Sequence, residues 1–161
     1  MATLKAYLKK WNLTELKINA GFLQANINFQ DADRQAAWEM YIELLTRVTT
    51  QVLNPTEGDE KTALTSVFSL FALTREVIKR HGPDCINFAK IAIIILNQII
   101  RPFTAKWHKL SLEGALEEEE NKYLFRSELQ QLQQSLRYYS KFLSEIADVE
   151  DLTALEQTPV G

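Results

Sequence analysis

Four long stretches of the chain carry apolar residues every three to four positions, the spacing of an amphipathic helix. The last is the clearest, because its intervals of four and three alternate as in the a and d positions of a coiled coil. Its apolar positions are Phe125, Leu129, Leu132, Leu136, Tyr139, Leu143 and Ile146. The others cover residues 31–53, 59–80 and 84–110. Each helix must bury its apolar face, so the sequence predicts a mainly α fold, an antiparallel bundle of four long helices.

Polar and turn residues predict where the first two helices begin and end. Asp31 and Asp33 are candidate N-caps of the first helix. Asn54-Pro55 ends it, because proline disfavours α geometry in the residue before it. Asp59 is the candidate N-cap of the second helix, which ends at Gly82-Pro83. The two helices have similar lengths, as expected of an antiparallel pair.

The apolar residues also predict which side of a helix faces the core. In the first helix the inward positions are Trp38, Tyr41, Ile42, Leu45, Val48 and Val52. The third helix begins at Asp84 and is apolar nearly all round, so we expect it at the centre. Pro102 lacks a backbone N–H and its ring clashes with the preceding turn, which predicts a kink or break there.

The two ends of the chain follow other patterns. Leu4, Tyr7, Leu8 and Trp11 predict a short N-terminal helix. Residues 16–29 alternate between apolar and polar around Gly21, which predicts a small hairpin or extended arm. From residue 149 the pattern dissolves, and we expect a disordered tail. We therefore expect an N-terminal helix and arm (1–30) packed on a helical bundle (31–148), followed by the tail (149–161).

Composition narrows the classes of function. Of 161 residues, 18 are basic and 21 acidic, so the formal charge of −3 disfavours a dedicated nucleic-acid binder. The single Cys85, with only His81 and His108 beside it, forms no recognisable metal or haem spacing, so we expect no cofactor and a reducing, cytoplasmic location. The most apolar run, 91–100, is shorter than the roughly twenty residues that cross a bilayer, so no membrane span is expected.

Polar side chains in the helical stretches are the first candidate site. Arg47 and Gln51 lie four residues apart, as do Asn97 and Arg101, and Arg75 lies on the second helix. Gathered in a cleft, these groups would bind a phosphate or carboxylate. The alternative is a structural network in which the arginines pair with glutamates and tie the helices together. Its candidate partners are Glu39, Glu43, Glu76 and Glu128.

The run from Arg101 to His108 is the second candidate. It holds a proline, two aromatic residues and several basic or titratable groups, and would make a binding lip that includes Lys106, Trp107 and His108. The alternative is that Phe103 and Trp107, four apart, simply cover the end of the core. His108 could carry a proton, but no partner residues for catalysis are recognisable from the sequence. The sequence shows no activated nucleophile or glycine-rich phosphate loop, so we expect a protein that is not an enzyme.

Several segments together resemble a group of uncharacterised bacterial proteins. They are 31–34 (Asp-Ala-Asp-Arg), 37–39 (Ala-Trp-Glu), 43–51 and 101–108. The resemblance implies an accessory component of a bacterial multi-gene system and carries no catalytic or binding residue with it. Our leading hypothesis is an interaction or regulatory module that binds another protein or its own copy. The alternative is a sensor that holds an anionic small ligand or nucleotide among the inter-helix arginines.

Overall fold

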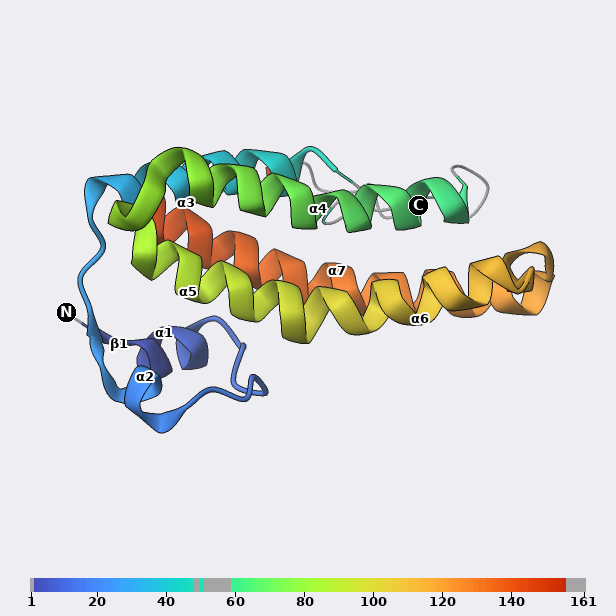
Figure 1. The fold of residues 1–161 in the computed structure, drawn as a ribbon, viewed down its shortest axis with the longest axis horizontal. Coiled ribbons are helices and arrows are strands. Elements are labelled where there is room, and N and C mark those ends of the chain that lie inside the picture. Colours follow the sequence, from blue (N-terminus) through green and yellow to red (C-terminus); the bar gives the residue numbers. More distant parts are fainter. Residues whose placement is uncertain (1, 48–49, 51–58, 156–161) are drawn as a thin grey trace.

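Helices make up most of the structure, a computed structural model that describes residues 2–47, 50 and 59–155 (Figure 1). The prediction of a mainly α chain is therefore confirmed. The long helices are α3 (Asp31–Leu45), α4 (Glu60–His81), α5 (Ile86–Ile95), α6 (Arg101–Leu112) and α7 (Glu119–Ala147). A π turn, η2 (Leu96–Ile100), joins α5 to α6, and short 3₁₀ turns, η1 (Gly82–Cys85) and η3 (Ala115–Glu117), precede α5 and α7.

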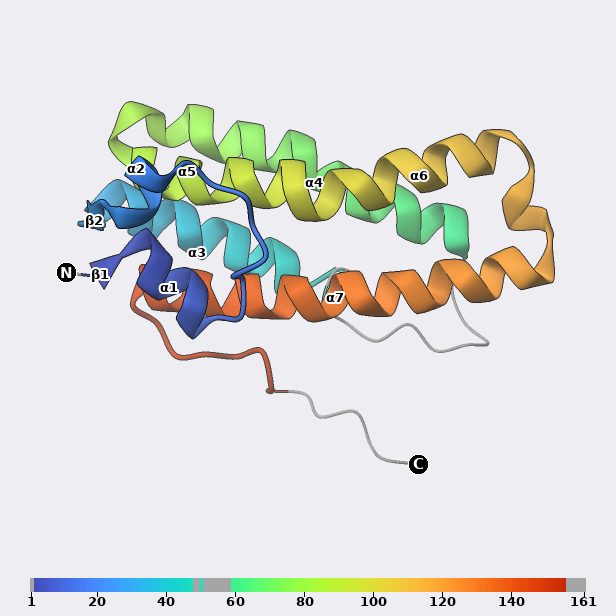
Figure 2. The ribbon, with the colours of Figure 1, turned by 90° about the horizontal axis from the view of Figure 1, so that it is seen from below.

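Neighbouring long helices run in opposite directions (Figures 1 and 2). The chain runs in one direction along α3, in the opposite direction along α4, again in the first direction along α5 and α6, and back along α7. Helix α7 also packs against α3. All seven predicted seam positions of α7, from Phe125 to Ile146, are buried. The core therefore runs between α7 and the other helices for most of their length.

The predicted boundaries of α4 are confirmed. The Asp59 side chain accepts a hydrogen bond from the backbone N of Thr62 (2.9 Å), as an N-cap does. At the other end Gly82 has φ +69°, a conformation that L side chains rarely adopt. At α3 the cap is Gln30 instead of Asp31 or Asp33; Asp33 accepts a hydrogen bond from the backbone N of Gln30 (2.8 Å).

The predicted inner face of α3 is partly wrong. Trp38 and Ile42 are 43% and 36% exposed, whereas Ala36, Ala37, Met40, Tyr41 and Leu44 are buried. The residues predicted to face inward and the residues found buried both recur every three to four positions, so the helical period alone could not show which set faces the core. The small side chains of Ala36 and Ala37 let α3 approach α7 closely, and this places Trp38 outside. Val48 and Val52 lie outside the described residues.

Pro102 does not break the helix. The backbone N of Arg101 donates to the carbonyl of Leu96, five residues back, so the turn before the proline is wider than an α turn. The wider turn accommodates the missing N–H and the bulk of the proline ring, and helical structure continues to Leu112.

Of the two forms predicted for residues 16–29, a hairpin or an extended arm, the hairpin around Gly21 is wrong. Asn19 caps a short helix, α2 (Ala20–Gln24), that includes Gly21. The only sheet among the described residues pairs β1 (Ala2–Thr3) with β2 (Asn26–Ile27). In the sequence, β1 precedes α1 (Leu4–Lys10) and β2 follows α2. The alternating apolar residues instead anchor an irregular segment: Leu13, Leu16 and Ile27 are buried.

The same segment is fastened to the long helices by polar contacts. Trp11 Nε1 donates to Glu145 of α7 (2.6 Å), and Lys10 pairs with the same carboxylate (2.9 Å). The Gln98 side chain, in the π turn, bonds both the N and the O of Lys17 (2.8 and 2.7 Å). At the other end of the chain, the backbone N of Leu152 donates to the hydroxyl of Tyr41. Of the tail expected to be disordered, residues 149–155 thus include a contact with α3, and 156–161 lie outside the described residues.

Candidate functional site

The outward side of α4 and α6 gathers several of the residues expected at a site. The Arg101 guanidinium lies over the ring of Phe71 of α4, 4.7 Å from its centroid. Its Nε and Nη2 donate to Asn97 Oδ1 (3.2 and 3.1 Å). Its Nη1 has no hydrogen bond within the described part of the chain. Arg101 is thus held in one orientation with one edge of its guanidinium open to a partner.

His108 extends the same surface along α6. Its ring meets the ring of Phe68 edge-on, with centroids 4.8 Å apart, and Phe68 in turn contacts Phe71 (5.6 Å). Phe68 is nevertheless 50% exposed. The surface therefore combines cationic or titratable groups with apolar area that no other described residue covers.

Arg75 adds a second guanidinium to this surface. It lies one helical turn beyond Phe71 on α4, is exposed, and makes no hydrogen bond or ion pair with any described residue. Lys79 follows one turn later. Ile93 of α5, across from α4, is 48% exposed. The whole stretch 86–112 contains four Lys or Arg residues and no Asp or Glu. We call this surface the basic face; it comprises Phe68, Arg75 and Lys79 of α4 and Ile93, Asn97, Arg101 and His108 of α5–α6.

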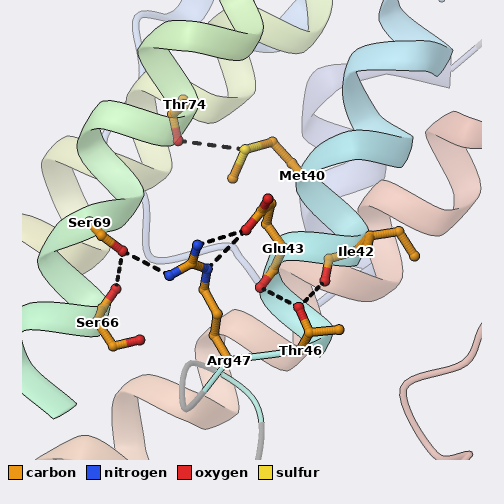
Figure 3. Close-up of polar contacts among 8 residues, drawn as sticks. All are labelled: Met40, Ile42, Glu43, Thr46, Arg47, Ser66, Ser69 and Thr74. Atoms are coloured by element: carbon orange, nitrogen blue, oxygen red, sulfur yellow. Dashed lines mark hydrogen bonds and ion pairs between the residues drawn. The ribbon is translucent and has the colours of Figure 1, made fainter. Parts of the chain in front are cut away.

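Arg47 does not join the basic face. Its Nε and Nη2 donate to Glu43 Oε2 (3.0 and 2.8 Å), and its Nη1 donates to Ser69 Oγ (3.1 Å; Figure 3). Ser69 and Phe71 are two residues apart on α4 and so point to nearly opposite sides of it. The structure thus places Arg47 in the paired, structural arrangement, on the other side of α4 from Arg101. Gln51 lies outside the described residues.

The predicted lip from Arg101 to His108 is divided by its own helix. Lys106 points toward α7 and pairs with both oxygens of Glu128 (2.9 and 2.7 Å). Trp107 is completely buried and meets Phe125 edge-on at 5.1 Å, and Phe103 contacts the same ring at 5.4 Å. Phe103 and Trp107 therefore cover the core end, as the structural alternative expects. Only Arg101 and His108 of this run belong to the basic face.

On the opposite side of α4 lies a groove that the sequence pattern did not reveal. It has a volume of about 390 Å³. We call it the acidic groove because three of its lining residues are glutamates, Glu39 and Glu43 of α3 and Glu76 of α4; Trp38, Ile42, Leu73, Val77 and Arg80 complete the lining. A second hollow, of about 400 Å³, shares Trp38 and Glu39 with it. Trp38 therefore lies between two hollows, and tryptophan is enriched among the residues that dominate binding at protein interfaces.

The carboxylates of the acidic groove differ in how they are used. Glu39 pairs with Arg80 (2.6 Å) and His81 (3.1 Å) at the end of α4. Glu43 uses Oε2 for Arg47. Glu76 is exposed and has no hydrogen bond or ion pair with any residue that the structure describes. One carboxylate in this groove is thus free to meet a cation from outside.

Two buried groups, Cys85 and Tyr139, are held in their neutral forms. Burial raises the pKa of the Cys85 thiol, and a neighbouring Asp33 adds to this effect, so the thiol is protonated at neutral pH. Burial also raises the pKa of Tyr139 well above its ordinary value. Within the described ranges, no three His, Cys, Asp or Glu side chains are grouped so that they could hold a metal ion.

One part of the helical stretch Glu60–Leu112 meets a length and composition test for crossing a membrane. Its most apolar 18-residue window has a mean hydropathy of 1.4, and 44% of that window is buried inside the protein. Helices at the core of soluble proteins pass the same test, so this is weak evidence. The expectation that no segment spans a membrane stays a prediction.

Comparison with known proteins gives no match: no family model, curated protein or solved structure matches the chain. The resemblance to uncharacterised bacterial proteins therefore stays a prediction. The geometry of the two surfaces beside α4 carries the functional argument.

Proposed function

We propose that this chain is a non-catalytic interaction module, a bundle of four long antiparallel helices that binds another protein or its own copy through the surface centred on α4. The observation that carries the proposal is the basic face, where Arg75 and an oriented Arg101 lie beside exposed Phe68 and Ile93. Interfaces combine apolar and aromatic anchors with arginine in this way. We further propose that the module acts in a bacterial cytoplasm, as an accessory component of a multi-gene system; the single cysteine supports the location and the resemblance noted above supports the role.

The test is a photo-crosslinking residue placed at the centre of this surface. Ala72 is exposed and lies on α4 between the acidic groove and the basic face. With a photoreactive phenylalanine at position 72, irradiation of cells should give a discrete protein adduct. The same residue at Gln134, an exposed position of α7, is the control. Absence of any adduct at position 72, or an equal pattern at position 134, overturns the proposal.

A second function is favoured by one observation. Arg75 and the Nη1 edge of Arg101 have no anionic partner among the described residues, so the basic face also suits a small anionic ligand or nucleotide. A sensor of this kind should melt at a higher temperature in the presence of its ligand, because binding to the folded state stabilises it. A panel of nucleotides and inorganic phosphate is the probe, with Arg101→Ala as the control. No shift with any of them overturns the sensor.

A further inference from the structure

The geometry points to a specific partner for this surface: a second copy of the same chain, in a symmetric dimer whose two-fold axis runs parallel to α4. This inference rests on the proposed function, since it names the occupant of the same surface. The acidic groove of each copy would cover the basic face of the other.

Helix α4 separates two surfaces of opposite charge, the acidic groove and the basic face. Glu76 and Leu73 line the α3 side of α4, whereas Phe68 and Arg75 lie on its α6 side. Between them the outward stripe of α4 carries two short, exposed side chains, Thr65 and Ala72, and then the exposed Lys79 one heptad further on. Short side chains let two helices approach closely. The middle of the surface thus suits packing of α4 against α4.

Only one direction of the two-fold axis makes these surfaces complementary. When two copies meet face to face about an axis parallel to α4, the α3 side of one covers the α6 side of the other, twice. An axis across α4 would instead place acidic groove on acidic groove. Opposite charges across an interface favour association, and like charges disfavour it. The parallel axis also closes the assembly at two copies, because each surface is used once.

The charged groups of the two copies also match in register, that is, in their position along α4. With the axis parallel to α4 and no shift along it, each α4 residue lies at the same level as its own copy. Arg75 of one copy then meets the partner's Glu76. Both side chains are exposed, and neither has an ion-pair partner among the residues described here. The contact occurs twice by symmetry.

The neighbouring helices are in register as well. Arg101 lies at the level of Phe71, and Glu43 lies one turn from Arg47, which is at the level of Ser69. Because α3 runs opposite to α4, Glu43 lies at about the level of residue 73. The open Nη1 edge of Arg101 therefore meets the partner's Glu43, whose Oε1 has no hydrogen bond within the described ranges.

The apolar groups fall at a second common level. Trp38 adjoins Glu39, which bonds Arg80 near the end of α4. Ile93 lies two turns before Arg101, and α5 runs opposite to α4, so Ile93 is also near the level of Lys79 and Arg80. The exposed Trp38 of one copy thus meets the exposed Ile93 of the other. Their burial supplies the apolar contact that the charged pairs orient.

The experiment is the mass of the purified full chain, measured by light scattering during gel filtration. We expect twice the 18.5 kDa of one chain. Arg75→Glu should weaken the dimer about tenfold or more, because it places two carboxylates together at each contact, and Glu76→Arg should do the same with two cations. Combining the two substitutions in one chain should restore the dimer, since each new glutamate then meets a new arginine in the other copy.

Matched controls separate this result from loss of the fold. Lys5→Glu reverses an exposed charge on α1 and should leave the dimer unchanged. Far-ultraviolet circular dichroism should be the same for all variants. A monomer at every soluble concentration, a dimer that ignores both single reversals, or a double variant that stays monomeric overturns the inference. A crosslinked adduct at position 72 with another protein only would also overturn it while leaving the proposed function standing.

Discussion

Asp59 fixes the start of α4 through a single carboxylate. Its Oδ2 accepts hydrogen bonds from both the backbone N and the hydroxyl of Thr62, at 2.9 and 3.0 Å. These bonds favour the charged form and hold the pKa of Asp59 below its ordinary value, with a small further contribution from Lys61. The sequence predicted this cap, because aspartate directly before an apolar helical pattern is a common N-cap.

The lowered pKa makes a pH prediction possible. A group whose pKa is lower in the folded state stabilises the fold above its unfolded pKa, and this contribution is lost as the pH falls through the folded pKa. Asp59→Asn keeps an N-cap of similar strength but removes the titration. At pH 7 we expect the variant to be equal or slightly less stable. Urea unfolding from pH 7 to below about pH 4 should show the wild type losing more stability than Asp59→Asn. Parallel curves at all pH values would contradict it.

Asp33 shows a contact that the sequence could not give. It is completely buried, and its two oxygens accept hydrogen bonds from the backbone N of Gln30 and of Phe88 (both 2.8 Å). The bond to Phe88 ties the start of α3 to the first turn of α5. The sequence identified Asp33 as a cap candidate, but the partner lies 55 residues away in the chain and depends on the packing of α5.

Removal of this carboxylate should be costly. In Asp33→Ala the buried N–H of Phe88 and the partly buried N–H of Gln30 lose their acceptor, and we expect a loss of about 2–4 kcal/mol in the free energy of unfolding. Asp31→Ala is the matched control, because Asp31 is exposed and pairs with Arg34 at the surface. We expect that change to be within about 0.5 kcal/mol. Urea denaturation measures both, and equal losses would refute the assigned role of Asp33.

At the scale of elements, the π turn η2 links the long helix to the N-terminal segment. The turn accommodates Pro102, and Gln98, one of its residues, forms two hydrogen bonds with the backbone of Lys17. The sequence predicted a disturbance at Pro102 but not its form. The wider turn keeps the helix continuous, whereas a break would have exposed apolar residues such as Phe103 on the next turn.

Gln98→Ala should release the segment around Lys17 without affecting the long helices. The variant loses two hydrogen bonds, worth about 0.5–1.5 kcal/mol each at most, since both are exposed. Hydrogen exchange should become faster at the Lys17 amide and stay unchanged in the middle of α7. Gln134→Ala, at an exposed position of α7, should leave both unchanged. Unchanged exchange at Lys17 in Gln98→Ala would show that other contacts hold the segment.

Helices with a strong apolar period were easier to predict than irregular segments. The seam of α7 was predicted residue by residue, because seven positions agree on one face. In residues 16–29 the same apolar residues suit a strand or an irregular segment, and only Asn19, as a cap of α2, indicates the helix. On α3 two apolar stripes competed, and the packing of Ala36 and Ala37 chose the one that leaves Trp38 outside.

The candidate site was only partly predictable for the same reason. Residues close in sequence, such as Arg101 and Lys106, were grouped as one lip, but their spacing of five residues, about 1.4 turns of helix, sends them to different sides. Arg75 joined Arg101 because α4 and α6 are neighbours, which follows from the fold. The acidic groove depends on the exposed position of Trp38, which the helical period had assigned to the core.

For the whole molecule, the distribution of charge matters more than its sum. The formal charge is only −3, yet residues 86–112 carry basic groups and no carboxylate. The α3 side of α4 carries Glu39, Glu43 and Glu76; Arg80 and Arg47 pair with the first two, which leaves Glu76 as the carboxylate without a cation among the described residues. In a dimer with its axis parallel to α4, these unlike surfaces meet. Exposed charge pairs are screened by salt, whereas apolar contacts are not weakened by it.

Trp38→Ala separates the apolar contribution from the charged one. Trp38 is 43% exposed in the single chain, so its removal should change the stability of dilute, monomeric protein little. At high protein concentration the wild type should melt at a higher temperature than when dilute, because dimerisation stabilises the folded state, and Trp38→Ala should lose this difference. Phe22→Ala is the control, because Phe22 is also exposed but lies beside Lys90 on α5, away from α4.

Raising the salt concentration should reduce the difference in wild type only in part, since the contact of Trp38 with Ile93 is apolar. Melting temperatures that do not depend on concentration in the wild type, or that respond equally to both substitutions, would exclude Trp38 as the anchor.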